Sequence, residues 1–259
     1  MSERLARGAR RSGRARSQHF LRKAVAAELV RDAGVGADDL VLDLGAGSGR
    51  LTAELARVAG RVIAVELDPR LAARLPRRWP NVTVVEGDAA AVALPREPFR
   101  VVANLPFAGA TSIMRHLLDD PRAPLLRADV VVEWPVALKR SLPWPSTLND
   151  VVWGAWYSTS LARRLPRSAF EPPPSVDTGV LVVERRACPL VPERWARDYR
   201  RFVAAGFRHG LRGVARGRTL RRLGLAGAAP RELDPYQWAA LFRCSRDCLQ
   251  FRHEGVSHP

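Results

Sequence analysis

The sequence has few lysines, few cysteines and no long apolar run, and the last two shortages exclude classes of protein. Lys23 and Lys139 are its only lysines. Its three cysteines, Cys188, Cys244 and Cys248, form no paired framework, which fits a reducing compartment. No apolar stretch is long enough to span a membrane, and the arginine-rich N-terminus lacks the apolar segment of a signal peptide. We therefore expect a cytoplasmic protein that is neither exported nor held in a membrane.

The cysteines also bear on metal binding. Cys244 and Cys248 can share one face of a helix, with His253 nearby. The usual spacing of zinc ligands and a fourth ligand are both missing from this segment. The sequence thus predicts free thiols and no metal site.

Positive charge is what the sequence has in excess. It carries 42 arginines and lysines against 26 aspartates and glutamates, which gives a formal net charge of +16 at pH 7. A GC-rich coding sequence explains why arginine replaces lysine, but it does not explain why cations outnumber carboxylates. A polyanionic partner explains that excess, and nucleic acid is the simplest one.

The N-terminal segment, residues 1–17, is basic and has almost no apolar side chains. Such a segment cannot bury a core, so we expect a flexible arm. One interpretation is a solvated tail without a role. We favour the other, contact with RNA phosphates, because the arm directly precedes a candidate active-site segment. The arginines expected to make this contact are Arg7, Arg10, Arg11 and Arg14.

Short apolar strands alternate with amphipathic helices over residues 18–187. The first apolar strand, 40–44, has no polar alternation, as expected when helices cover both faces of a sheet. The alternation predicts an α/β catalytic domain with a doubly wound, mostly parallel sheet. Residues 188–259 read as helices only, which predicts a small arginine-rich helical domain. A charged face of this kind is usually just solvated, but we expect part of it, including Arg208 and Arg212, to bind RNA phosphates.

Gly45, Gly47 and Gly49 stand between the first apolar strand and the following helix. Glycine is needed where backbone turns tightly or approaches a ligand closely, although a plain strand–helix turn has the same pattern. Two carboxylates favour a ligand. Glu66 ends the next strand, where it can accept both ribose hydroxyls of a nucleoside, and Asp88 follows the third strand, where it can accept from an adenine amino group. Because the glycine spacing is not the dinucleotide form, we expect a pocket for S-adenosylmethionine.

The segment Asn104-Leu105-Pro106-Phe107 ends the fourth strand at the same edge of the sheet. The exocyclic amine of a nucleobase is a poor nucleophile, because its lone pair is delocalised into the ring. The Asn104 side-chain oxygen and the Leu105 carbonyl can both accept from that amine. Pro106 would stiffen the loop, and Phe107 would stack on the base. The tetrapeptide alone is equally consistent with a turn, but after the cofactor motifs we predict that these four residues are catalytic.

In order and spacing, the motifs resemble those of the rRNA adenine-N6 methyltransferase family, which includes the Erm resistance enzymes and the KsgA-type small-subunit enzymes. The resemblance covers roughly residues 15–250 and takes in two further segments, Gln18–Leu21 and Phe170–Val176. It implies a Rossmann-like class I methyltransferase fold that depends on S-adenosylmethionine. It also implies that the cofactor is touched by His19, Leu21, Gly45, Glu66, Asp88 and Asn104.

Two residues depart from the family pattern. The family usually has Asn where His19 stands, and it commonly has Tyr where Phe107 stands. Histidine can still donate and accept a hydrogen bond, and stacking needs only an aromatic ring. We therefore expect cofactor contact and activity to survive both departures.

Three functions stay open at this point. The long arginine arm, Phe107 and the arginine-rich tail favour the Erm branch. That branch would add one or two methyl groups to an adenine in the peptidyl-transferase region of 23S rRNA and confer resistance to macrolides, lincosamides and streptogramin B. The alternatives are a KsgA-type 16S rRNA dimethyltransferase and a non-catalytic RNA-binding or assembly factor. In each case ribosomal RNA is the expected partner of a monomeric protein.

Overall fold

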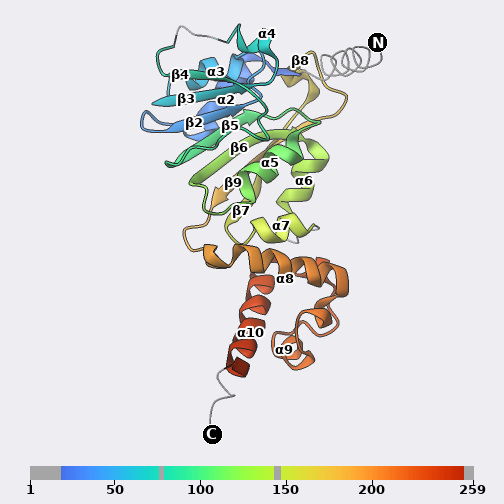
Figure 1. Cartoon of the computed structure of the whole chain (residues 1–259). Helices are drawn as coiled ribbons and strands as arrows, with labels where there is room; N and C mark the ends of the chain where they lie inside the picture. Colours follow the sequence, from blue (N-terminus) through green and yellow to red (C-terminus); the bar gives the residue numbers. More distant parts are fainter. Residues whose placement is uncertain (1–18, 76–78, 143–146, 254–259) are drawn as a thin grey trace, which may run out of the picture. The chain divides into compact units, whose positions relative to one another are not determined.

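The computed structural model describes residues 19–75, 79–142 and 147–253, with side chains up to residue 246 (Figure 1). The basic arm, with the predicted RNA contacts of Arg7, Arg10, Arg11 and Arg14, lies outside the described residues, as does the thiol of Cys248. No helix in the described ranges has the length and apolar character of a membrane span. The described chain divides into two compact units, and each is considered by itself.

The first unit is built on a mixed sheet of seven strands among the described residues, in the order β4-β3-β2-β5-β6-β9-β7. The five strands from β4 to β6 are parallel, and β9 is antiparallel to β6. This confirms the predicted doubly wound, mostly parallel sheet. The strands are β2 (Leu40–Leu44), β3 (Arg61–Glu66), β4 (Val82–Glu86), β5 (Phe99–Asn104), β6 (Leu125–Glu133), β7 (Tyr157–Leu165) and β9 (Thr178–Arg185).

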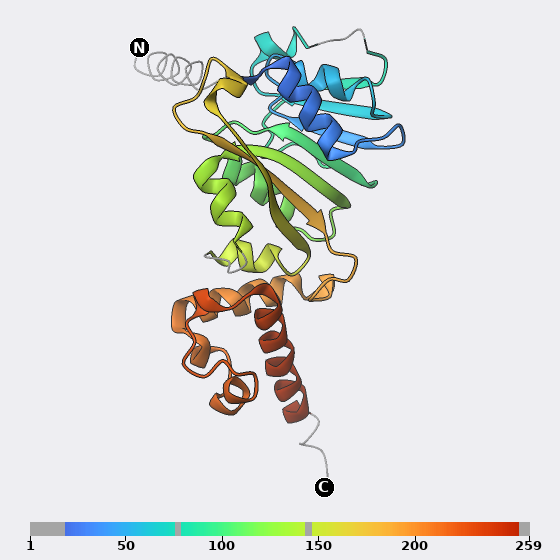
Figure 2. The same ribbon diagram turned by 180° about the vertical axis from the view of Figure 1, so that it is seen from behind.

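Helices cover both faces of this sheet. Helices α2 (Lys23–Ala33) and α3 (Arg50–Leu55) lie over one face, seen from the front in Figure 2, and α5 (Ala110–Leu118) lies over the other, seen from the front in Figure 1. Apolar residues of α2 and α3 pack against Val41, Val62 and Val102 of the sheet. The burial of β2 on both faces explains why its sequence shows no polar alternation.

The remaining short elements of this unit show where local sequence signals succeed and where they fail. Asp68 caps the short helix α4 (Pro69–Ala72), as the Asp-Pro pair predicts, by accepting from the Arg70 amide. Strands β1 (Phe20–Leu21) and β8 (Phe170–Glu171) were not predicted, because each has only two residues. They pair antiparallel across about 150 residues of chain, so only the folded structure creates them.

The second unit comprises residues 120–122, 139–159 and 185–259, of which the C-terminal part is helical as predicted. Its core is a set of aromatic rings in edge-to-face or stacked contact: Trp156, Tyr199, Phe202, Phe207, Trp238 and Phe242. The helices of this unit include α7 (Leu148–Trp153), α8 (Ala196–His209), α9 (Gly217–Arg222) and α10 (Pro235–His253), and α6 (Trp134–Ser141) leads into it from the first unit. The predicted functional domains, 1–17, 18–187 and 188–259, stay predictions.

Candidate active site

The glycine loop between β2 and α3 adopts a backbone that favours glycine. Gly45, Gly47 and Gly49 have φ angles of 80°, 56° and 74°, in the left-handed region. The amides of Gly45 and Ala46 both donate to the Val65 carbonyl, at 2.8 and 3.0 Å, which ties the loop to the end of β3. The loop therefore stands at the carboxyl edge of the parallel strands, where ligands bind in open α/β sheets.

Two other segments approach the loop too closely for any side chain there. A Cβ on Gly45 would lie 3.0 Å from Cδ of Pro106, and a Cβ on Gly47 would lie 2.7 Å from Cε1 of Phe20. The glycine loop, which the sequence predicts to bind the cofactor, therefore lies against strand β1 and against the segment 104–107, the predicted substrate loop. The structure thus brings together three motifs that lie far apart in the sequence.

Glu66 is hydrogen-bonded to the glycine loop through its carboxylate. Its side chain is 7% exposed. One carboxylate oxygen accepts from the Gly47 amide at 2.7 Å, and the other accepts from the Asp68 amide at 2.8 Å. Each oxygen keeps a further lone pair, so the same carboxylate can accept from ribose hydroxyls while it orders the loop.

Asp88 lies one strand further along the same edge. Glu66 and Glu86 are register partners on β3 and β4, and Asp88 follows two residues later. Its side chain is exposed and accepts from the Ala90 amide at 2.9 Å. Asp88 therefore presents an acceptor beside Glu66, where the sequence predicts the adenine amino group.

Asn104 has an unusual hydrogen-bond arrangement. Its side-chain nitrogen donates to the His19 carbonyl at 2.7 Å. Its side-chain oxygen is buried and has no hydrogen-bond partner within the part of the chain that the structure describes. Because a buried acceptor without a partner is costly, such a group indicates a ligand donor.

The other residues of the substrate loop are held by backbone hydrogen bonds and by packing. The Leu105 amide donates to the Val131 carbonyl of β6, and the Leu105 side chain is 1% exposed. Pro106 is exposed and its carbonyl accepts from the Gly109 amide at 2.8 Å, which closes a turn. Phe107 is half-buried, with its ring centroid 5.5 Å from that of His19. The loop thus holds an acceptor and an aromatic ring next to the glycine loop.

Two residues that the sequence analysis did not select, Arg50 and Glu171, connect these parts. Arg50 begins α3 directly after the glycine loop and donates to the Leu21 carbonyl at 3.2 Å and to Glu171 at 3.0 Å. It therefore joins the cofactor loop to both strands of the β1–β8 pair. The Leu21 side chain itself is buried in the core under α2 and α3. No local sequence signal identifies Arg50, since its partners are 29 and 121 residues away.

Asp43 is a buried carboxylic acid directly before the glycine loop. It is 1% exposed and accepts from the Thr52 hydroxyl at 2.7 Å. Burial raises the pKa of Asp43 to about 7, and the nearby Glu66 carboxylate adds to this rise while the Thr52 hydrogen bond opposes it. Asp43 thus anchors the start of α3 from within the core.

Arg208 and Arg212 belong to the helical unit. Both are exposed, on α8 and on the short 3-10 helix that follows it, Leu211–Gly213. Further exposed arginines lie in the same segment: Arg216, Arg218, Arg221 and Arg222. No described carboxylate lies within ion-pair distance of any of these arginines or of Arg208 and Arg212. The segment therefore offers a dense set of unpaired cations.

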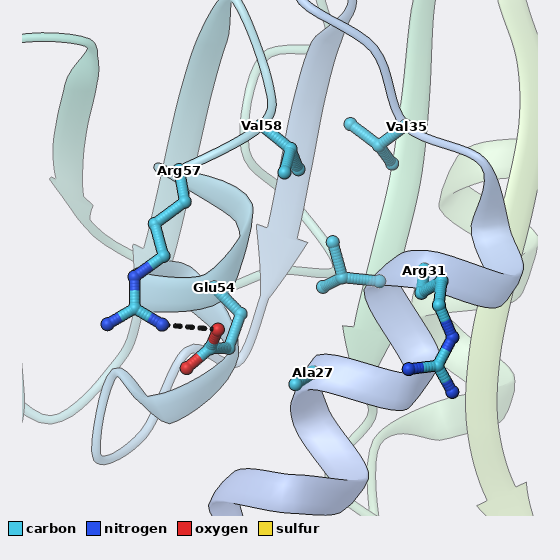
Figure 3. Close-up of a pocket in the computed structure, with 7 residues that line it drawn as sticks. Ala27, Arg31, Val35, Glu54, Arg57 and Val58 are labelled. Atoms are coloured by element: carbon cyan, nitrogen blue, oxygen red, sulfur yellow. Dashed lines mark hydrogen bonds and ion pairs between the residues drawn. The ribbon is translucent and has the colours of Figure 1, made fainter.

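A separate hollow of about 310 Å³ lies in the first unit (Figure 3). It is lined by the later part of α2 and by the end of α3 with the turn after it. Glu54 and Arg57 are joined there by an ion pair of 2.6 Å. None of its lining residues belongs to the glycine loop or the substrate loop. The hollow is therefore not part of the candidate active site.

The strand order, the left-handed glycine loop and the carboxylate at the end of the second parallel strand define the fold of S-adenosylmethionine-dependent methyltransferases. A solved structure of the 23S rRNA methyltransferase ErmE has the same fold, with a TM-score of 0.74 and 29% identity, over 86% of this chain and 98% of that one. The family model of ribosomal RNA adenine dimethylase matches residues 12–216. The chain belongs to that family.

Two curated relatives refine the comparison. The mycinamicin-resistance protein MyrB of Micromonospora griseorubida is 38% identical over 199 residues, which are 72% of this chain and 63% of MyrB. An rRNA adenine N-6-methyltransferase of Streptomyces fradiae is 37% identical over 258 residues, which are 91% of this chain and 79% of that protein. The matched part of the chain thus spans less than two thirds of MyrB.

Replacing Arg50 by Ala should weaken cofactor binding without unfolding the protein. The Arg50 and Glu171 side chains are 36% and 63% exposed, so their ion pair adds little to stability, whereas the loss of the hydrogen bond from Arg50 to the Leu21 carbonyl removes a link between β1 and the start of α3. We expect the dissociation constant for S-adenosylmethionine, measured by calorimetry, to rise by roughly 3- to 10-fold, the effect of losing one or two such contacts. The matched control is Arg57→Ala, which removes the pair with Glu54 and touches neither strand. Equal affinities for both variants would contradict this role.

Replacing Asp43 by Asn should change how stability depends on pH. The pKa of Asp43 is raised in the folded protein, so the folded state holds the proton more tightly than the unfolded state does. Its contribution is therefore fully present below pH 3.8 and is lost as the pH rises to about 7. The free energy of unfolding of wild type relative to Asp43→Asn should fall across this window, by up to about 1.4 kcal/mol per pH unit.

Denaturant unfolding at several pH values measures this difference. Asp38→Asn, at an exposed carboxylate, is the control and should show no such trend. A wild-type advantage that grows with pH would refute the assignment.

Proposed function

We propose that this protein transfers methyl groups from S-adenosylmethionine to N6 of one adenine in the peptidyl-transferase region of 23S rRNA. The modification would protect the ribosome from macrolide, lincosamide and streptogramin B antibiotics, because it removes a hydrogen-bond donor and adds bulk at the drug site. The single observation that carries the chemistry is the buried side-chain oxygen of Asn104 beside the glycine loop, which has no hydrogen-bond partner among the residues that the structure describes. The likeness to MyrB and ErmE supports the choice of RNA and the role in resistance.

The residues present fit the cofactor. The glycine loop stands at the carboxyl edge of the parallel strands, where ligands bind in open α/β sheets, Glu66 has lone pairs for the ribose hydroxyls, and Asp88 has an acceptor for the adenine of the cofactor. S-adenosylmethionine supplies an electrophilic methyl group on a sulfonium. The cofactor contacts assigned to His19, Leu21, Gly45 and Gly47 are part of this proposal.

Asn104 and Leu105 would activate the target amine. Its nitrogen is a poor nucleophile while the lone pair is shared with the ring. Hydrogen bonds to the Asn104 oxygen and the Leu105 carbonyl draw the nitrogen toward a tetrahedral arrangement and localise that lone pair. After attack the nitrogen is cationic and loses its proton readily, so no side chain has to act as a base beforehand. Phe107 would stack on the extruded base, and Pro106 would keep the loop rigid.

The charge distribution supports an RNA partner. The exposed arginines at the end of α8 and on α9, Arg208 and Arg212 among them, have no carboxylate partners in the described chain and are free to meet phosphates. The arginines of the N-terminal arm, Arg7, Arg10, Arg11 and Arg14, would extend that contact. We propose that the protein acts as a monomer in the cytoplasm, where ribosomal RNA is made accessible during assembly.

The proposal is tested by methyl transfer from labelled cofactor to protein-free 23S and 16S rRNA in parallel, with primer extension to locate the product. We expect a stop in the peptidyl-transferase region of 23S rRNA. Modification of 16S rRNA alone would assign the protein to the small-subunit branch of the family. RNA binding without transfer to either molecule would indicate a non-catalytic assembly factor.

Asn104→Ala should abolish this transfer. The variant loses the acceptor for the target amine, so we expect kcat to fall by at least about 100-fold, as for the loss of a donor to a developing charge elsewhere. RNA affinity should change by less than about 2-fold, since the base contact is a small part of the interface. The control is Asn149→Ala in the helical unit, where the side-chain oxygen accepts from Arg200. Substantial turnover by Asn104→Ala would refute the mechanism.

Replacing Arg208 and Arg212 together by Gln should weaken RNA binding and flatten its dependence on salt. Each lost phosphate contact lowers the slope of log affinity against log salt by about 0.7 to 0.9, so a fall of roughly 1.5 is expected for two contacts. The control is Arg122→Gln, because that guanidinium is already bound by Asp120. Filter binding across a salt series measures both, and an unchanged slope in the double variant would exclude these arginines from the interface.

A further inference from the structure

His19 touches both functional side chains of the substrate loop. Its carbonyl accepts from the Asn104 side-chain nitrogen at 2.7 Å. Its imidazole lies against Phe107, with ring centroids 5.5 Å apart and planes tilted by 31°. Nδ1 of the same ring lies 3.0 Å from the Pro172 carbonyl. One residue thus joins the substrate loop to the segment that follows β8.

These contacts fix the imidazole in one orientation. A carbonyl oxygen can only accept, so Nδ1 must carry the proton and donate to Pro172. That bond restrains rotation of the His19 side chain about its χ1 and χ2 bonds. The His19 backbone is restrained because strand β1, which begins at the next residue, pairs with β8. The imidazole therefore presents a fixed face to Phe107.

Phe107 depends on such a neighbour. It is half-buried and follows β5 on an exposed turn, with Pro106 and Ala108 open to solvent on either side. A phenylalanine has no polar atom that could hold its ring in place, so its orientation is set by the groups packed against it. Among the described residues, the aromatic ring in contact with Phe107 is the His19 imidazole.

We propose that the His19 imidazole is a positioning residue for the target adenine. It holds the Phe107 ring in the orientation that stacks on the base, while its carbonyl holds the Asn104 amide with the oxygen free. The resemblance to the family suggests only a cofactor contact for this position. We assign the His19 side chain a further role, which is to position the ring that stacks on the target base. It rests on the proposed adenine methylation and not on the choice between 23S and 16S rRNA.

Two replacements separate the effect of the aromatic ring at position 19 from that of its hydrogen bond to Pro172, and a third is the control. His19→Phe keeps an aromatic ring against Phe107 and loses the donor to Pro172. His19→Asn, which introduces the residue usual in the family, removes the ring. His116→Asn is the matched control, because that imidazole bonds the Val92 carbonyl and touches neither loop. Cofactor affinity, kcat and the melting temperature are measured for each.

We expect His19→Asn to lower kcat by about 10-fold, the size of one lost aromatic contact. Cofactor affinity should change less than about 2-fold, because asparagine, the residue usual in the family, can make the cofactor contact proposed for this position. His19→Phe should keep most of the turnover. In an RNA with 2-aminopurine at the target position, fluorescence should be quenched by wild type and His19→Phe and released by His19→Asn. A residue that only stabilised the fold would lower the melting temperature without changing this signal.

A double-mutant cycle gives the decisive result. If His19 acts through Phe107, His19→Asn should have little further effect on kcat in a Phe107→Ala background. Additive effects, or a raised cofactor dissociation constant with unchanged quenching, would overturn the inference. Failure of wild type to methylate any rRNA would instead refute the proposed function, and the inference with it. Normal wild-type transfer with an unaffected His19→Asn variant would refute the inference alone.

Discussion

The hydrogen bond from the Asn104 amide to the His19 carbonyl is the contact on which the site depends. It uses one of the two N–H groups of the Asn104 amide, and the buried side-chain oxygen has no hydrogen-bond partner among the described residues, so that oxygen is open to a ligand donor. The bond requires that β1 lie beside the end of β5. That position exists because β1 pairs with β8 and because Arg50 bonds both the Leu21 carbonyl and Glu171.

A parallel sheet makes this convergence possible. The carboxyl ends of β2, β3, β4 and β5 share one edge, so the glycine loop, Glu66, Asp88 and Asn104 meet although some sixty residues separate them in sequence. Glu66 combines two roles at this edge, because it orders the glycine loop and is proposed to bind the cofactor. One oxygen of its carboxylate accepts from the Gly47 amide and the other from the Asp68 amide, and the same carboxylate is the acceptor that we propose for the ribose hydroxyls of the cofactor.

The arginines fall into two classes that composition cannot distinguish. In the first unit many are bound to carboxylates, as in Arg100 with Asp39 and Arg127 with Asp129, and these pairs fasten strands and helices. At the end of α8 and on α9 the arginines have no acidic neighbours in the described chain. Part of the net charge of +16 therefore comes from arginines that form no ion pair with a described carboxylate. That separation supports an RNA-binding role for the helical unit.

Sequence alone predicts the sheet, the glycine loop and the residues at the strand ends, because periodicity, glycine and carboxylates at those positions are local signals. It did not reveal β1, β8, Arg50 or the burial of Asp43. Each of these depends on partners that are distant in the chain, as when Phe20 closes on Gly47 or His19 on Phe107. The contact of His19 with the substrate loop is visible only in the folded chain, since a side chain's neighbours across a fold are set by packing and not by spacing.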